Sequence, residues 1–145
     1  MNLFNRKTRY VVGFMLSADM SQVVLIQKNR PAWQRGRLNG VGGKIDSTDS
    51  SSLSCMIREF EEETGLVVKS WQLFCTLTGK DFIVDFYYSV GDVEKVDTVT
   101  DEKVAIFDIC MLPPAVLPNI RWLIQMALSM KNGEKCHHFD IKQVD

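Results

Sequence analysis

The sequence predicts an α/β fold in which two helices cover opposite faces of a mixed β-sheet, an α/β/α sandwich. Segments rich in Val, Ile, Phe and Leu are bounded by polar turns, which indicates strands. Two other segments, one ending near residue 64 and one over residues 119–130, space their apolar residues as a helix does. Because 145 residues suffice for one hydrophobic core and are few for two, we expect residues 1–145 to form a single domain.

The expected strands follow in chain order: residues 8–16, 22–27, 67–78, 82–90 and 103–109, with a short final strand near residue 138. The polar turn Ser17-Ala18-Asp19 separates the first two strands, and Gly79-Lys80-Asp81 separates the third and fourth. Each of these pairs therefore reads as a hairpin. The last helix is expected after Pro113 and Pro114, and the first lies between the two hairpins.

A glycine-rich turn, Asn39-Gly40-Val41-Gly42-Gly43-Lys44, precedes the first helix. Glycine permits backbone conformations closed to other residues and lets a ligand approach the main chain. The helix is expected to begin at Ser50, Ser51 or Ser52, without a Glu or Gln to complete a capping box. Gly65 suits the left-handed residue that follows the last helical turn.

The first helix is expected to expose a stripe of carboxylates. At about 100° per residue, Glu59, Glu62 and Glu63 share one arc, beside an apolar arc that contains Leu53, Met56, Ile57 and Phe60. Like charges three and four residues apart repel, so a positive group is expected on the stripe. Mg²⁺ is a natural candidate because it prefers oxygen ligands. The alternative is an ordinary solvated helix face.

At these residues the chain resembles the Nudix hydrolase family, whose signature is G-x5-E-x7-R-E-U-x-E-E-x-G-U, with U a bulky apolar residue. Residues 58–66 match the second half of this signature at every defined position. In the first half, the segment from Gly43 to Arg58 is one residue longer than the pattern, and Asp49 or Ser50 replaces the early Glu. We interpret this as an insertion in the turn of residues 47–52. The resemblance covers most of the chain, is weakest after about residue 110, and implies the same Nudix-type α/β/α sandwich.

The resemblance implies metal-dependent hydrolysis of a diphosphate linkage, with Mg²⁺ as the cofactor and Mn²⁺ as an alternative. The implied metal ligands are the backbone carbonyl of Gly42 and the carboxylates of Glu59, Glu62, Glu63 and Glu102. In family members a later loop brings an acidic residue to the metal, and Glu102 stands at the corresponding place in this chain. Asp101 could take this role in its stead. The alternative is that these residues form an ordinary polar turn without a role at the metal. The implied catalytic set is Arg58, Glu59, Glu62, Glu63 and Glu102. Arg58 is expected to orient a glutamate, or simply to pair with Glu62 at i,i+4.

Segment 38–44 resembles that of MutT-type enzymes, which hydrolyse oxidised purine nucleoside triphosphates and use an Asn here to touch the nucleoside. The resemblance therefore implies that Asn39 binds substrate, and that Asn119 reads the base, although Leu117 and Asn119 replace a Trp and an Asp of the animal enzymes. An Asn can read a purine edge bidentately, but Asn119 could instead cap the last helix. Lys28 and Lys44 lie among the basic residues around the glycine turn and are candidates for binding an anionic substrate; the alternative is a basic loop that only aids solubility. The possible stacking residues, Trp33, Trp122, Phe86 and Tyr87, are each better explained as core.

Composition narrows the choice of partners. A net charge of −1 argues against a nucleic-acid polymer, and no apolar run approaches the length of a membrane span. Four widely spaced cysteines read as reduced thiols in a cytoplasmic protein, and Cys136-His137-His138 is not expected to bind zinc. The expected partner is a small nucleotide, and the oligomeric state stays open, with a homodimer as one option. Alternative functions are a dinucleoside polyphosphate hydrolase and a non-catalytic nucleotide-binding module; such modules usually lose the glutamates that this chain keeps.

Overall fold

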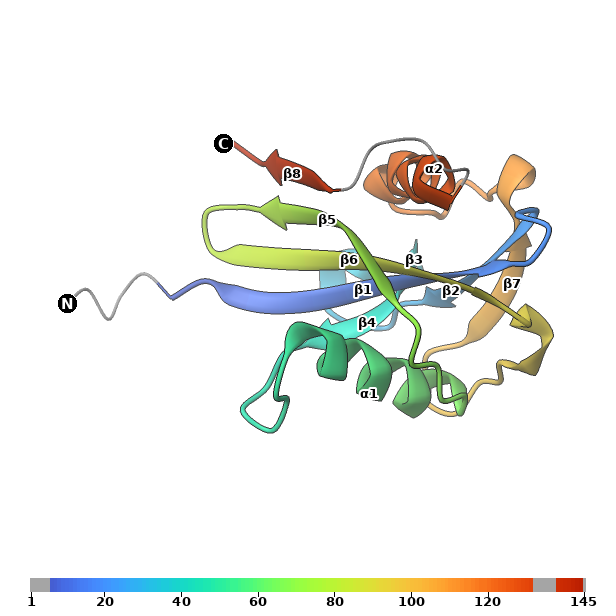
Figure 1. Cartoon of the computed structure of the whole chain (residues 1–145), viewed down its shortest axis with the longest axis horizontal. Helices are drawn as coiled ribbons and strands as arrows, with labels where there is room; N and C mark the ends of the chain where they lie inside the picture. The colour runs from blue at the N-terminus through green and yellow to red at the C-terminus, as the bar shows by residue number, and fades with distance from the viewer. Residues whose placement is uncertain (1–5, 132–137, 145) are drawn as a thin grey trace.

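The computed structural model describes residues 6–131 and 138–144 and confirms the α/β/α architecture, with α1 and α2 on opposite faces of one sheet (Figure 1). The helices are α1, Ser52–Thr64, and α2, Pro118–Lys131. The strands are β1 Thr8–Ser17, β2 Gln22–Gln27, β3 Leu38–Asn39, β4 Val41–Lys44, β5 Gln72–Thr78, β6 Phe82–Gly91, β7 Val104–Asp108 and β8 Phe139–Lys142. Short 3-10 turns span Ala32–Gln34, Val93–Lys95 and Ile109–Met111.

The sheet is mixed and is organised around β1. Its order is β3-β2-β1-β6-β5-β8, with β4 added to β1 and β7 added to β2. β1 runs parallel to β6 along its whole length, pairs with β4 from Tyr10 to Gly13, and meets β2 at Leu16. The glycine-rich segment, expected only as a turn, is therefore largely strand. Its hydrogen bonds come from the backbone, so its side-chain pattern gives no sign of the pairing.

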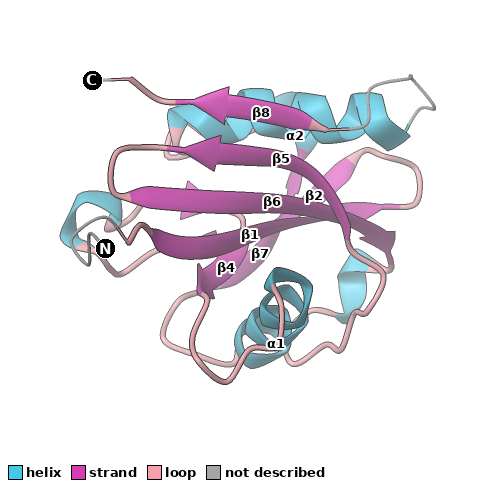
Figure 2. Cartoon of the chain, turned by 60° about the vertical axis from the view of Figure 1, so that its left-hand side comes forward, coloured by secondary structure: helices cyan, strands magenta, loops and turns pink. Residues whose placement is uncertain are grey.

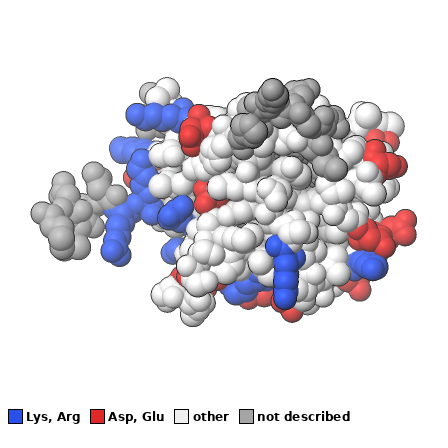
Figure 3. Space-filling model, viewed as in Figure 1, with Lys and Arg blue, Asp and Glu red and all other residues white. Residues whose placement is uncertain are grey.

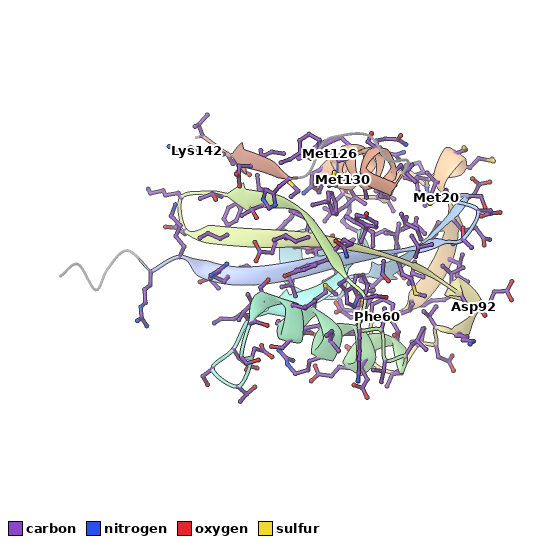
Figure 4. The ribbon with its side chains drawn as sticks, viewed as in Figure 1. Met20, Phe60, Asp92, Met126, Met130 and Lys142 are labelled. Atoms are coloured by element: carbon purple, nitrogen blue, oxygen red, sulfur yellow. The ribbon has the colours of Figure 1, made fainter. Side chains whose placement is uncertain are left out.

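Alternating side chains of the central strands fill two hydrophobic cores. Phe14 and Leu16 of β1 face α2, whereas Val11 and Met15 of the same strand face α1. Phe60 of α1 points into one core, and Met126 and Met130 of α2 are partly buried against the other core (Figure 4). A view turned by 60° shows the same two layers on either side of the sheet (Figure 2). Both faces of the sheet are therefore covered, as a sandwich requires.

The ends of α1 are fixed by its sequence. Ser51 is the N-cap and accepts from the Ser54 N–H, while Ser54 Oγ accepts from the Ser51 N–H, so a capping box is present without Glu or Gln. The prediction that no capping box forms was wrong, because a serine hydroxyl also reaches the N-cap amide. Gly65 ends the helix at φ 76°, as expected.

Several expectations needed correction. Residues 67–71 form no strand: β5 begins at Gln72, and the Trp71 indole N–H donates to the Val68 carbonyl within the preceding segment. Trp33 and Trp122 are not core residues but are 70% and 42% exposed, whereas Phe86 and Tyr87 are buried. Leu53, placed in the apolar arc of α1, is 39% exposed.

The expectation about Cys136 and His137 concerns residues that lie outside the described part of the chain. None of the described helices is long and apolar enough to span a membrane.

Candidate active site

The three glutamates of α1 are held by contacts within the protein. Glu59 and Glu62 both accept from Arg58 Nη1, at 3.0 and 3.1 Å. Glu63 Oε2 instead accepts from Thr100 Oγ1 at 2.7 Å. A positive group on the carboxylate stripe is therefore Arg58, whose contact with Glu62 is the i,i+4 pair that the sequence offered as one alternative.

Arg58 is itself fixed by Asp49. Its Nε and Nη2 atoms donate to the two Asp49 oxygens at 2.8 Å each, and the Asp49 side chain is only 3% exposed. The Arg58 guanidinium lowers the pKa of Asp49 far below its usual range, against the opposing effect of burial. Ser50 faces Ser54 instead. Of the two residues that the sequence offered for the early acidic position, Asp49 is therefore the one that contacts Arg58.

Gly43 of β4 brings the carboxylate stripe against a cavity. A Cβ at Gly43 would overlap the Glu59 carboxylate, coming 2.5 Å from each of its oxygens. The same glycine lines the cavity together with Gly42 and Lys44. Burial raises the pKa of Glu59, while the Arg58 charge opposes that rise. Gly43 therefore lets the most buried of the three glutamates approach the cavity wall.

Gly43→Ala is expected to lower kcat by roughly 10- to 100-fold, because a misplaced reacting group loses about that much rate. The fold should survive, since the displaced atoms are the end of a flexible side chain. Gly91→Ala is the matched control, as its Cβ would meet only the Met15 methyl group within 3 Å. Equal kcat for Gly43→Ala and the control would remove Glu59 from the site.

The cavity, about 940 Å³ in volume, collects the residues expected to bind substrate. Its lining includes four of them from different parts of the chain: Lys28 from the loop after β2, Asn39 from β3, Lys44 from β4 and Asn119 from α2. Val12, Val84 and Phe86 contribute apolar wall from the sheet. Figure 3 shows Lys and Arg side chains gathered at the end of the molecule where β1 begins, and Thr8 and Gln143 extend the cavity toward that end.

The two asparagines differ in how they are held. Asn39 Oδ1 accepts from the Gly40 N–H at 2.8 Å, and its Nδ2 donates to Gln34 Oε1 at 3.3 Å. Asn119 is half-buried at the cavity and is the second residue of α2, which begins at Pro118. Its position inside the first turn disagrees with the alternative that it is the N-cap of this helix.

Glu102 does not join the α1 glutamates. Its Oε1 accepts from Lys28 Nζ at 3.0 Å and its Oε2 from the Asn29 N–H at 2.6 Å. Burial favours the neutral form, but the Asn29 and Lys28 hydrogen bonds outweigh it and lower the pKa of Glu102. Its proposed substitute, Asp101, forms an exposed pair with Arg30. The sequence analysis assigned no role to Thr100, because no motif predicts its hydrogen bond to Glu63.

The described part of the chain contains no group of three Asp, Glu, His or Cys side chains close enough to hold a metal. The donors of α1 nevertheless suit a hard cation, since Glu59, Glu62 and Glu63 offer carboxylate oxygens from one helix. Burial is the main cause of the raised pKa of Glu59, and the neighbouring carboxylates of Glu62 and Glu63 add to it. A bound ion would compete with Arg58 and Thr100 for some of these oxygens.

Mg²⁺ is expected to raise Tm, and to do so more at pH 8 than at pH 5. Ligand binding to the folded state stabilises it by about 2.7 kcal/mol at 100 times Kd. The raised pKa of Glu59 means that more of this carboxyl is protonated at low pH, and bound Mg²⁺ must displace that proton. Thermal unfolding with and without millimolar Mg²⁺ measures the effect. A Tm indifferent to Mg²⁺ at both pH values would contradict a metal site.

Comparison with known proteins adds independent findings. The sequence model of the NUDIX domain matches residues 7–129, while no curated protein matches the chain. A MutT structure from work on Aliivibrio salmonicida and Vibrio cholerae is 20% identical, with TM-score 0.65, over 81% of this chain and 94% of that one. A MutT NUDIX hydrolase from Burkholderia pseudomallei is 18% identical, with TM-score 0.71, over 83% and 98%. The NUDIX domain of Shewanella oneidensis NrtR, crystallised with ADP ribose, is 18% identical, with TM-score 0.71, over 88% and 90%.

Proposed function

Since the chain belongs to the Nudix family, we propose that it hydrolyses the diphosphate linkage of a purine nucleoside triphosphate, oxidised purines included, to a monophosphate and pyrophosphate. The observation that supports this most is the position of Gly43, between the Glu59 carboxylate and a cavity lined by Lys28, Lys44 and two asparagines. A substrate in this cavity would bring its phosphates to the acidic helix.

The proposed mechanism divides the work between charge and position. A bound divalent cation, Mg²⁺ or Mn²⁺, would supply charge neutralisation at the phosphoryl oxygens and acidify water. Glu59, Glu62 and Glu63 would hold it, with the Gly42 carbonyl as a further ligand. Arg58, anchored by Asp49, donates to both Glu59 and Glu62 and would thereby orient their carboxylates. Lys44, at the cavity, is placed to bind substrate phosphate.

We propose that the base is recognised by the apolar part of the cavity and by the side-chain amide of Asn119. Val12 and Phe86 offer flat apolar surface, on which a purine can pack. Asn119 presents a half-buried amide at the same cavity, with both a donor and an acceptor. The MutT proteins similar in structure support this substrate class.

Asn119→Ala is expected to reduce discrimination between purine and pyrimidine triphosphates by about 1 to 3 kcal/mol, the value of a bidentate amide contact. The phosphate contacts are untouched, so the loss should appear in substrate ratios. The measurement is kcat/KM for 8-oxo-dGTP, dGTP and dCTP. Gln125→Ala, an exposed site on the same helix, is the control. Unchanged ratios with a lowered Tm would assign Asn119 to the fold.

A nucleotide panel tests the proposal as a whole. Phosphate release is measured after pyrophosphatase treatment, with Mg²⁺ in one arm and EDTA in the other. Hydrolysis of purine triphosphates only in the Mg²⁺ arm supports the proposal. Preferential cleavage of dinucleoside polyphosphates would favour the alternative hydrolase. Binding without turnover would favour a nucleotide-sensing module, an alternative that gains support from Arg58 bonding both Glu59 and Glu62 and from the similarity to NrtR.

A further inference from the structure

The turn of residues 100–102 joins the acidic helix to the cavity wall. Toward α1, Thr100 donates to Glu63 at 2.7 Å. Toward the cavity, Glu102 accepts from Lys28 Nζ at 3.0 Å and from the main-chain N–H of Asn29 at 2.6 Å. The Glu102 side chain is only 4% exposed, so these contacts are shielded from water. Charge-assisted hydrogen bonds of this kind are the strong ones.

Lys28 begins a loop, residues 28–37, that forms part of the cavity wall. The loop is closed at its base, where the Lys28 N–H bonds the Arg37 carbonyl and the Gly36 N–H bonds the Lys28 carbonyl. Between these points, Arg30, Trp33 and Gln34 line the cavity. The position of these side chains therefore depends on what holds the first residues of the loop.

Both oxygens of Glu102 are engaged at that point. An ion bound by Glu102 would have to compete with the Lys28 ammonium and the Asn29 main-chain N–H for the two Glu102 oxygens. Removing the Glu102 charge would instead leave the Lys28 ammonium, itself only 18% exposed, without its partner.

We propose that Glu102 is a positioning residue, which holds Lys28 and the loop of residues 28–37 in the cavity wall and acts on nucleotide binding through them, not as a metal ligand. This inference rests on the proposed function only in taking a nucleotide as the ligand of the cavity. Without Glu102 the loop becomes mobile, and binding must then order it at an entropic cost.

The test uses Glu102→Gln, Lys28→Gln and the double variant, with Glu94→Gln as the control, at an exposed glutamate outside the loop and outside the cavity lining. Affinity for a non-hydrolysable nucleoside triphosphate is measured in EDTA, and Mn²⁺ affinity is measured by calorimetry on nucleotide-free protein. Each single variant is expected to weaken nucleotide binding by about tenfold, and the double variant no further, because coupled residues are non-additive. Mn²⁺ affinity should stay within about twofold of wild type, since no α1 ligand is altered.

Weaker Mn²⁺ binding in Glu102→Gln with normal binding in Lys28→Gln would overturn the proposal, as would additive effects on nucleotide affinity. Hydrogen exchange gives a readout that needs no nucleotide. The Asn29 amide, bonded to Glu102, should exchange faster in Glu102→Gln and Lys28→Gln than in Glu94→Gln. Equal exchange in all three would also overturn it. If Glu102→Gln fails to fold, Lys28→Arg should restore slow exchange where Lys28→Gln does not, and equal exchange in these two would refute the pairing.

Discussion

Glu63→Gln is expected to lower kcat by about 1000-fold, and Glu62→Gln by a similar factor, because each removes a charge that a bound metal needs in the transition state. Gln keeps the shape of Glu and can still accept from Thr100 or Arg58, so the fold should survive. Affinity for substrate should change less than turnover.

Glu61→Gln provides the matched control, since Glu61 is an exposed carboxylate on the same helix that has no assigned role. Its kcat should equal that of the wild type, and the Tm of all three variants should lie close together. Wild-type turnover of Glu62→Gln and Glu63→Gln at saturating Mg²⁺ would contradict the assignment of the acidic stripe.

Asp49→Asn is expected to destabilise the protein by about 2 to 4 kcal/mol, the order of cost for removing one member of a largely buried ion pair. Asp49 is 3% exposed and holds Arg58 through two hydrogen bonds of 2.8 Å. Arg58 would then lose its anchor while keeping its contacts with Glu59 and Glu62. We therefore also expect a lower kcat.

The effect of Asp49 should depend on pH in a defined direction. Its pKa is lower in the folded state than the ordinary 3.8, so its stabilisation is present above that value and is lost as pH falls below it. Urea unfolding at pH 7 and near pH 3 measures the difference between wild type and Asp49→Asn, which should shrink at the lower pH. Asp46→Asn, at a 49% exposed carboxylate 3.5 Å from Arg58, should have little effect. If the difference in the free energy of unfolding between wild type and Asp49→Asn were the same at both pH values, the ion pair with Arg58 would not be its cause.

The sequence predicted the parts of the fold that depend on local pattern. The helix α1 was recognisable because its serines, its apolar stripe and Gly65 all point to one helix. β4 was missed as a strand because glycines provide no side-chain period, and its pairing with β1 is made by the backbone. Trp33 was expected in the core, yet its side chain is exposed and lines the cavity.

The candidate site was predictable in its residues but not in their contacts. The motif indicated Glu59, Glu62 and Glu63. The resemblance indicated Asn39 and Asn119, and the basic residues around the glycine turn indicated Lys28 and Lys44; these last four side chains line one cavity. The sequence left Asp49 and Ser50 as candidates for the early acidic position. Only the folded path of the serine-rich turn shows that Asp49 reaches Arg58. The partner of Glu102 lies 74 positions away at Lys28, a separation that local spacing does not reveal.

The central claim is that the acidic face of α1 and the adjacent cavity act together on a diphosphate linkage. Phosphorus NMR of dGTP or 8-oxo-dGTP incubated with the protein and Mg²⁺ tests it most directly. We expect a nucleoside monophosphate and pyrophosphate to appear together in equal amounts, with no reaction in EDTA or with Glu63→Gln. Release of orthophosphate with a nucleoside diphosphate, or intact nucleotide in the presence of Mg²⁺, would contradict it.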